Sequence, residues 1–240
     1  MTRWVLALSA TLWGSLAAAG EATVAVAANF LTTAETLAEA FEAETGHRIV
    51  ITHGSTGQLY AQIVQGAPFD IFLSADEERP ARLKEEGRAT EVRTYALGRL
   101  VLVSRAPVDA ATVGEAVAGQ TVALADPTVA PYGKAATTAM EKLRLDTATF
   151  RPVLVANVGQ VATVFVTGNA DFAFVSASQL PAMAAPFTMD LAGLVAPIRQ
   201  DAALLDRAQG NDAARAFWDW LASAAAAGTI RDAGYGAPGA

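Results

Sequence analysis

The stretch that decides the fold is ATVAVAANFLTTAETLAEAFEAETGHRIVITH, residues 22–53. It begins with a small, apolar and partly β-branched run, which is typical of a buried strand, and its last run, RIVITH, predicts a second strand. Between them, Thr32 and Glu35 match the pattern of a helix capping box, and Gly46 predicts the end of that helix. Apolar residues recur here with the spacing of one helix face: Ala34, Leu37, Ala38 and Phe41.

The same alternation of strand and helix continues along the chain. Further strands are predicted at 69–75, 95–104, 121–125, 152–156, 171–175 and 197–205. Helix starts are predicted at the capping patterns Ser74-x-x-Glu77, Asn157-x-x-Gln160 and Ser176-x-x-Gln179. Such βαβ units with nearly continuous apolar strands indicate an α/β protein. We expect two lobes, one made of 21–101 with 198–240 and the other of 102–197, with crossings at 95–104 and 197–205.

The composition excludes several classes of protein and of site. The chain has 240 residues, of which 52% are hydrophobic, and a formal net charge of −7. Because it contains no cysteine, it cannot form a disulfide framework, a thiol nucleophile, or a cysteine-ligated zinc or iron–sulfur site. An acidic chain lacks the basic face that nucleic-acid phosphates require, so we expect no nucleic-acid partner.

The first twenty residues have the pattern of a secretory signal peptide. Arg3 gives a short basic start, residues 4–16 are apolar, and Ala17 and Ala19 form an A-x-A cleavage pattern. The apolar run is shorter than the roughly 20 residues that span a bilayer. We therefore expect residues 1–20 to be cleaved and the protein to be exported to a periplasm. Since a bacterial lipid anchor is attached to cysteine, we expect no lipid anchor.

Four junctions between a predicted strand and a predicted helix have an unusual composition. They lie at 28–30, 54–57, 126–133 and 157–160, and they contain hydroxyls, amides and glycines but only one charged residue, Asp126. In open α/β sheets, ligands bind beyond the carboxyl ends of the strands, where exposed N–H groups of helix N-termini can hold an anion. Any one of these residues alone could be an ordinary cap or turn residue. Together, the four junctions predict a site for a small anion.

Several segments carry a resemblance to a known family. They are AANF (27–30), HGSTG (53–57), AQIVQGAPFDIFLSAD (61–76), DPTVAPYG (126–133), TGNADFAFVSASQ (167–179) and PIRQD (197–201). With these motifs the chain resembles the periplasmic molybdate/tungstate-binding proteins of ABC transporters over essentially all of its length after the signal peptide. The most specific of the segments is 61–76.

The resemblance implies a class II periplasmic-binding-protein fold, in which two α/β lobes, each a mixed sheet flanked by helices, hold the ligand in the cleft between them. It implies a monomeric binding protein rather than an enzyme, with no cofactor, that captures molybdate or tungstate and delivers it to an ABC permease in the membrane. Many members bind the ligand through a tyrosine where this chain has Val175, so Tyr132 is expected to supply that hydroxyl. The family's ligand-binding positions fall on Ala28, Asn29, Ser55, Thr56, Tyr132 and Val158.

Three alternatives to this assignment stay open. One is another tetrahedral oxyanion, such as sulfate or vanadate, although fixed donors would disfavour the smaller sulfate. A second is an iron-binding relative, which would use tyrosine pairs and histidine, whereas the four tyrosines here include no adjacent pair. A third is a secreted hydrolase with a triad of His53, Ser55 and Asp70 or Asp76, although the nucleophile motif G-x-S-x-G is absent.

Overall fold

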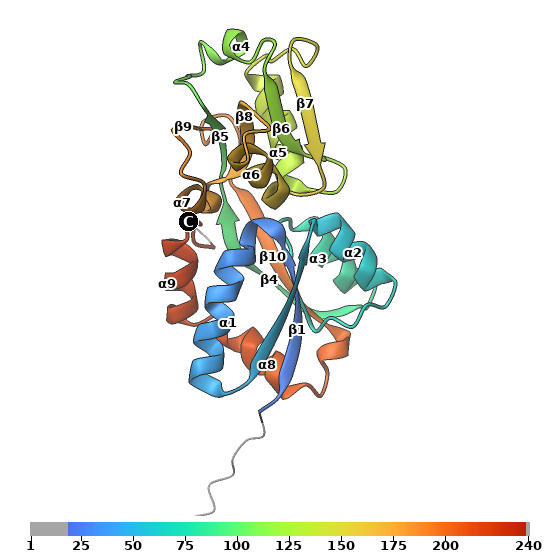
Figure 1. The fold of residues 1–240 in the computed structure, drawn as a ribbon. Coiled ribbons are helices and arrows are strands. Elements are labelled where there is room, and N and C mark those ends of the chain that lie inside the picture. The colour runs from blue at the N-terminus through green and yellow to red at the C-terminus, as the bar shows by residue number, and fades with distance from the viewer. Residues whose placement is uncertain (1–18, 239–240) are drawn as a thin grey trace, which may run out of the picture.

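The structure, a computed structural model, describes residues 19–238 and divides the chain between two lobes, each with its own five-stranded sheet (Figure 1). Both sheets are mixed and flanked by helices, which confirms the predicted fold class. The predicted signal peptide falls almost entirely on residues 1–18, which lie outside the described part. Among residues 19–238, no helix is both long enough and apolar enough to cross a bilayer.

Lobe I contains the first sheet, with the strand order β2-β1-β3-β10-β4. Strand β1 pairs in parallel with β2 and β3, and β10 pairs antiparallel with β3 and β4. Its strands are β1 (Glu21–Ala27), β2 (Arg48–Gly54), β3 (Ile71–Leu73), β4 (Ala89–Gly98) and β10 (Ile198–Leu205). Its helices are η1 (Ala28–Phe30), α1 (Leu31–Thr45), α2 (Thr56–Val64), α3 (Glu78–Glu85), η3 (Asp206–Ala208), α8 (Asp212–Trp220) and α9 (Ala224–Asp232).

Both faces of the lobe I sheet are covered, which explains why its central strands are apolar throughout. Val24 and Val26 of β1 belong to the core under α1, α8 and α9, together with Phe41 and Trp218. Ala25, between them, belongs to the core under α2 and α3. Successive strand residues point to opposite faces, so a strand buried on both sides has no polar alternation.

Lobe II contains the second sheet, with the strand order β7-β6-β8-β5-β9. Strand β6 pairs in parallel with β7 and β8, whereas β5 pairs antiparallel with β8 and β9. Its strands are β5 (Leu100–Ser104), β6 (Thr121–Ala125), β7 (Arg151–Val155), β8 (Phe172–Ser176) and β9 (Phe187–Asp190). Its helices are α4 (Val113–Ala116), α5 (Pro131–Lys142), α6 (Val158–Val166), η2 (Ala177–Gln179) and α7 (Leu180–Met183).

The chain passes between the lobes twice, from β4 to β5 and from β9 to β10. The prediction of one continuous strand at 95–104 was wrong, because β4 ends at Gly98 and β5 begins at Leu100. The two halves pair in different sheets, β4 with β10 and β5 with β8. A Cβ at Gly98 would lie 2.2 Å from the Tyr132 hydroxyl and 2.4 Å from Gln200 Nε2, so this crossing has no room for a side chain.

Two of the predicted helix starts were also wrong. Helix α1 begins at Leu31, one residue before Thr32, and has no side-chain cap, because the turn η1 leads directly into it. Helix α3 begins at Glu78 rather than near Ser74, whose hydroxyl bonds to the Asp76 carboxylate at 3.0 Å.

The other predicted starts agree with the structure. The Ser176 capping box is present, and Asn157 Oδ1 accepts from the Gln160 N–H at 3.0 Å at the start of α6. Strand β9 was missed, because its sequence, FTMD, lies in a stretch rich in Pro and Ala that has no strand pattern.

Candidate anion-binding site

The four junctions singled out from the sequence meet between the lobes. Strands β1 and β2 of lobe I end there at η1 and α2, and β6 and β7 of lobe II end at the loops that lead to α5 and α6. A small cavity of about 10 Å³ lies among them. This is about the space occupied by one water-sized probe, far below the hundreds of Å³ of pockets for drug-sized ligands. All six predicted positions line it: Ala28, Asn29, Ser55, Thr56, Tyr132 and Val158.

Two buried hydroxyls lie at the start of α2. Ser55 is 2% exposed, and its Oγ accepts from the Gln58 N–H at 3.3 Å as the helix cap. Thr56 is 1% exposed, and its Oγ1 accepts from the Ala75 N–H at 3.2 Å. Since each hydroxyl already accepts a hydrogen bond from the protein, its proton is left to donate to a ligand.

Helix α6 directs its first N–H groups at the cavity from lobe II. Val158, its first residue, is 3% exposed and lines the cavity. The first N–H groups of a helix have no carbonyl partner within the helix and carry the positive end of its dipole. The Asn157 cap occupies the Gln160 N–H, so the Val158 N–H remains suited to a ligand. A ligand contact from the backbone N–H of Val158 is compatible with this geometry.

The Tyr132 hydroxyl is set up as a donor. Its oxygen accepts hydrogen bonds from the Ser176 hydroxyl at 2.9 Å and from the Gln200 Nε2–H at 3.5 Å. The other end of the same amide, Gln200 Oε1, accepts from the Asn29 amide and the Tyr95 hydroxyl. Burial raises the pKa of Tyr132 far above its ordinary value, so the hydroxyl keeps its proton. With two donors on its oxygen, that proton is available to a ligand in the cavity.

Asn29 offers a ligand its backbone rather than its side-chain amide. Its side-chain amide donates to Gln200 Oε1 at 2.9 Å and to the Tyr235 hydroxyl at 3.1 Å. The side chain is thus engaged inside the protein, which leaves the backbone of Asn29 for a ligand. Ala28 can likewise bond to a ligand only through its backbone, because its side chain is a methyl group.

Sequence reasoning missed the polar side chains behind this cavity. Gln200 lies within a run that was predicted only as extended, and Tyr235 lies in the C-terminal segment after α9. Nothing local marks either residue as functional, since both come to the site through long-range folding. Val175, where relatives were expected to have a tyrosine, is fully buried in the core of lobe II.

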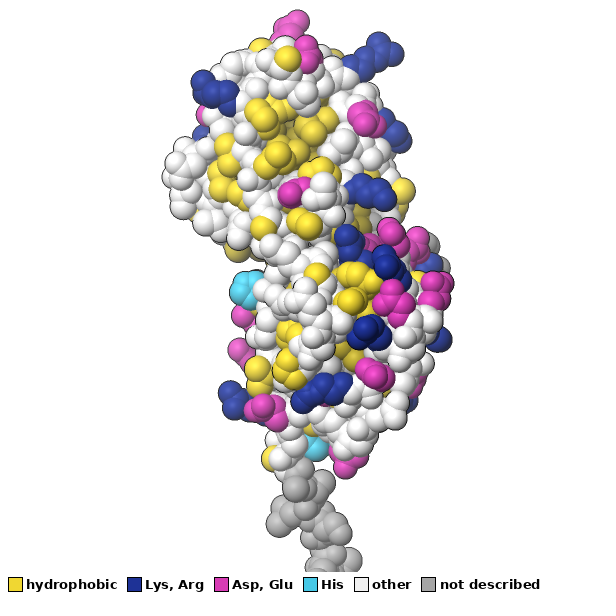
Figure 2. All heavy atoms as spheres, turned by 90° about the vertical axis from the view of Figure 1, so that its right-hand side faces the viewer, with side chains coloured by type: hydrophobic (Ala, Val, Ile, Leu, Met, Phe, Trp, Pro, Cys, Tyr) yellow, Lys and Arg dark blue, Asp and Glu magenta, His cyan; other side chains and the backbone are white. Residues whose placement is uncertain are grey.

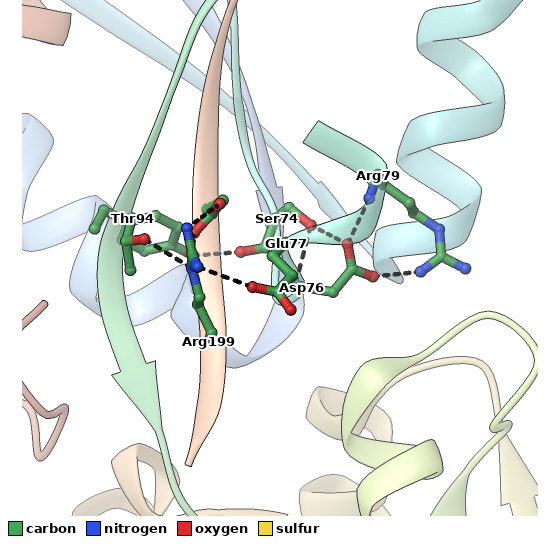
Figure 3. A network of polar contacts seen from close by, with 8 residues as sticks. Ser74, Asp76, Glu77, Arg79, Thr94 and Arg199 are labelled. Atoms are coloured by element: carbon green, nitrogen blue, oxygen red, sulfur yellow. Dashed lines mark hydrogen bonds and ion pairs between the residues drawn. The ribbon is translucent and has the colours of Figure 1, made fainter. Parts of the chain in front are cut away.

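Charged side chains of lobe I near the site form ion pairs with one another. The Asp76 carboxylate bonds to the Arg79 side chain and accepts from the Arg79 N–H at 3.1 Å (Figure 3). Arg199 pairs with Glu77 at 3.1 Å and with Asp201 at 3.0 Å. On the face in Figure 2, positive and negative side chains are interspersed over lobe I, whereas hydrophobic side chains gather on lobe II. Within residues 19–238, no charged residue lines the cavity. Its attraction for an anion therefore depends on dipoles.

The structure does not bring the suggested hydrolase triad together. Ser55 Oγ caps α2, and the Asp70 carboxylate accepts from the Thr23 N–H at 2.8 Å. His53 is exposed on β2, and Asp76 is paired with Arg79. Among the described residues there is also no cluster of three His, Cys, Asp or Glu side chains that could hold a metal ion.

Comparison with known proteins agrees with the fold and with the resemblance found in the sequence. A model of the family described as bacterial extracellular solute-binding protein matches residues 22–236. The molybdate-binding protein ModA of Azotobacter vinelandii is 39% identical over 98% of each chain, and that of Rhodobacter capsulatus is 42% identical over 91% of this chain and 89% of the relative. The solved periplasmic molybdate-binding protein of A. vinelandii superimposes with a TM-score of 0.82 and 36% identity over 90% of this chain and 99% of that one. The chain belongs to the bacterial extracellular solute-binding protein family.

Proposed function

We propose that this chain is an exported binding protein that captures molybdate, or the similar tungstate, between its lobes and delivers it to an ABC permease. The observation that carries the proposal is the convergence of uncharged hydrogen-bond donors from both lobes on one small cavity. The names of the two ModA relatives and of the solved A. vinelandii protein support the choice of ligand.

In this proposal the ligand is held by donors alone. Ser55, Thr56 and Tyr132 donate through their hydroxyls, and Ala28, Asn29 and Val158 contribute through their backbone. Each hydrogen bond to a charged acceptor contributes about 1.5–3 kcal/mol, so several of them can replace the hydration of a dianion without an ion pair. A singly protonated oxyanion is disfavoured, because its O–H finds no acceptor in such a shell.

The rest of the proposal concerns the whole chain. The boundaries between the lobes lie at the two crossings, near residues 101 and 198, and the lobes close on the ligand about these crossings. Residues 1–20 are removed on export, and the protein acts in the periplasm as a monomer without a lipid anchor.

A thermal-shift panel tests the ligand. Molybdate, tungstate, vanadate, sulfate, phosphate and iron are compared at equal concentration, because a ligand that binds only the folded state raises the melting temperature. We expect molybdate and tungstate to give the largest shifts. A larger shift with iron or phosphate would contradict the proposal.

Competition calorimetry then tests selectivity. Sulfate at millimolar concentration should leave the molybdate titration unchanged, because donors held by two closed lobes cannot follow a smaller anion inward. Equal competition by sulfate would instead identify a sulfate-type binding protein.

A further inference from the structure

A cluster of three residues, Asn29, Ser178 and Tyr235, joins the two lobes beside the cavity. The single Tyr235 hydroxyl proton is shared between the Asn29 carbonyl oxygen at 2.7 Å and the Ser178 Oγ at 2.9 Å. The Ser178 hydroxyl donates to the same Asn29 carbonyl oxygen at 3.1 Å. The Asn29 side-chain amide in turn donates to the Tyr235 oxygen at 3.1 Å. Asn29 and Tyr235 belong to lobe I, whereas Ser178 belongs to η2 of lobe II.

Tyr235 is fixed in lobe I independently of Ser178. Gly236, the next residue, pairs with Leu97 of β4 through two backbone hydrogen bonds of 2.8 and 3.0 Å. The Tyr235 ring packs edge-on against Phe30, with the ring centroids 5.2 Å apart. The C-terminal segment thus holds this hydroxyl in a set position on the lobe I side of the cleft.

Ser178 arrives from the opposite side, on the turn η2, whose capping residue Ser176 bonds to Tyr132 of the site. Its hydroxyl lies 2.8 Å from that of Ser176, which donates to Tyr132. Asn29, on the lobe I side, lines the cavity itself. The cluster therefore links a ligand-facing turn of lobe I to the hydrogen bonds that orient a ligand-facing hydroxyl of lobe II.

We propose that Tyr235 is a positioning residue for the anion site, whose hydroxyl, with Ser178, forms an interlobe latch that holds the lobes closed over the bound oxyanion. The latch rests on the proposed oxyanion-binding function. The latch requires that Ser178 move away from Asn29 and Tyr235 when the lobes separate, so that its bonds to them exist only in the closed form. Ligand affinity and residence time then depend on two residues that do not touch the ligand.

A double-mutant cycle tests the latch, with molybdate as the probe. Tyr235→Phe and Ser178→Ala should each weaken binding about three- to tenfold, the effect of a lost neutral hydrogen bond. The double mutant should lose clearly less than the product of the two single losses, because both changes remove the same interlobe contact. Molybdate should also dissociate faster from Tyr235→Phe than from the wild type.

A structural role alone would give a different pattern. In the ligand-free chain, urea unfolding should show the two substitutions to be additive, since the open lobes keep the residues apart. Tyr60→Phe is the matched control, because the Tyr60 hydroxyl bonds to Glu86 on the surface of lobe I, and it should bind like the wild type. Wild-type affinity in Tyr235→Phe, or simple multiplication of the two losses, would overturn the latch.

The same experiment separates this inference from the proposed function. If the wild-type chain binds no oxyanion of the thermal-shift panel, the proposed function is wrong and the latch is wrong with it. If the wild type binds and Tyr235→Phe binds equally well, only the latch is wrong.

Discussion

At the scale of single residues, the site uses side chains whose hydrogen bonds to the protein decide what they can offer a ligand. Thr56 accepts from a backbone N–H, and Tyr132 receives two donors on its oxygen. Each hydroxyl is thereby left with one proton to donate. An anion site built this way needs no cation, which fits a cavity without charged residues in the described part of an acidic chain.

Replacing Thr56 by valine tests one of these donors. Thr56→Val keeps the shape of the side chain but removes the hydroxyl, so molybdate affinity should fall at least about tenfold, the effect of one charge-assisted bond. Isothermal titration calorimetry measures the change. Thr45→Val, at the exposed end of α1, is the control and should bind normally. Normal binding by Thr56→Val would remove this residue from the site.

The buried tyrosines determine how the protein responds to alkaline pH. Burial raises the pKa of Tyr132 and Tyr95, and it raises the pKa of Tyr235 to about 12. The donors stay protonated, so molybdate affinity should be constant between about pH 7 and about pH 10. Above about pH 10 the unfolded chain loses tyrosine protons that the folded chain keeps, so the free energy of unfolding should fall as pH rises.

Urea unfolding as a function of pH measures this effect. Each such tyrosine contributes a slope of up to about 1.4 kcal/mol per pH unit. Tyr235→Phe should show a shallower decline than the wild type between about pH 10 and about pH 12. Parallel curves for the two proteins would mean that Tyr235 titrates normally in the folded state.

At the scale of elements, helix N-termini provide the positive end of the site. Helices α2, α5 and α6 all begin at the cavity, and the caps of α2 and α6 are polar side chains, Ser55 and Asn157. A cap holds the first turn in place and leaves the earlier N–H groups free for a ligand. The same residue can therefore stabilise the helix and orient the site.

Asn157→Ala separates these two effects. The loss of the cap should lower the free energy of unfolding by about 1 kcal/mol and also weaken molybdate binding, because the first turn of α6 is no longer held. Ser223→Ala removes the side-chain cap of α9, away from the cavity, and should cost similar stability with unchanged binding. Calorimetry and urea unfolding on both variants make the comparison. Equal affinity in the two would show that the α6 cap has only a structural role.

At the scale of the whole molecule, the lobes contact each other on both sides of the cavity. The Gly57 N–H of lobe I donates to the Val129 carbonyl oxygen of lobe II at 2.9 Å. A Cβ at Gly57 would lie 3.0 Å from both the Cα and the carbonyl oxygen of Val129. The close approach of two backbones thus depends on the absence of a side chain at this position.

Gly57→Ala should interfere with closure rather than with folding. The added methyl group pushes against Val129 only when the lobes are closed, so molybdate affinity should fall several-fold while the ligand-free chain keeps its stability. Gly228→Ala, in α9 with no atom within 4 Å of its Cβ position, is the control. It should bind normally and gain up to about 1 kcal/mol of stability from helix propensity. Wild-type affinity in Gly57→Ala would mean that this contact is not part of the ligand-bound form.

Much of the fold and site could be predicted because the signals are local. The apolar run of β1, the helix face of α1 and the cap at Ser176 are each written within a few neighbouring residues. The break at Gly98 was missed because residues 95–104 (YALGRLVLVS) are mostly apolar, and only the pairing of β4 and β5 in different sheets divides them. The role of the Asn29 side chain was missed because its partner Gln200 is distant in sequence.

The sequence alone determined the α/β class, the four uncharged junctions and the resemblance to oxyanion-binding proteins, since periodicity and motif are properties of short segments. The tertiary structure alone decided that the junctions face one cavity and that the Asn29 amide bonds within the protein. It also decided that Tyr235, from the end of the chain, lies beside the site. These facts depend on contacts between residues far apart in the chain, and such contacts form only when packing of the two cores brings the strand ends together.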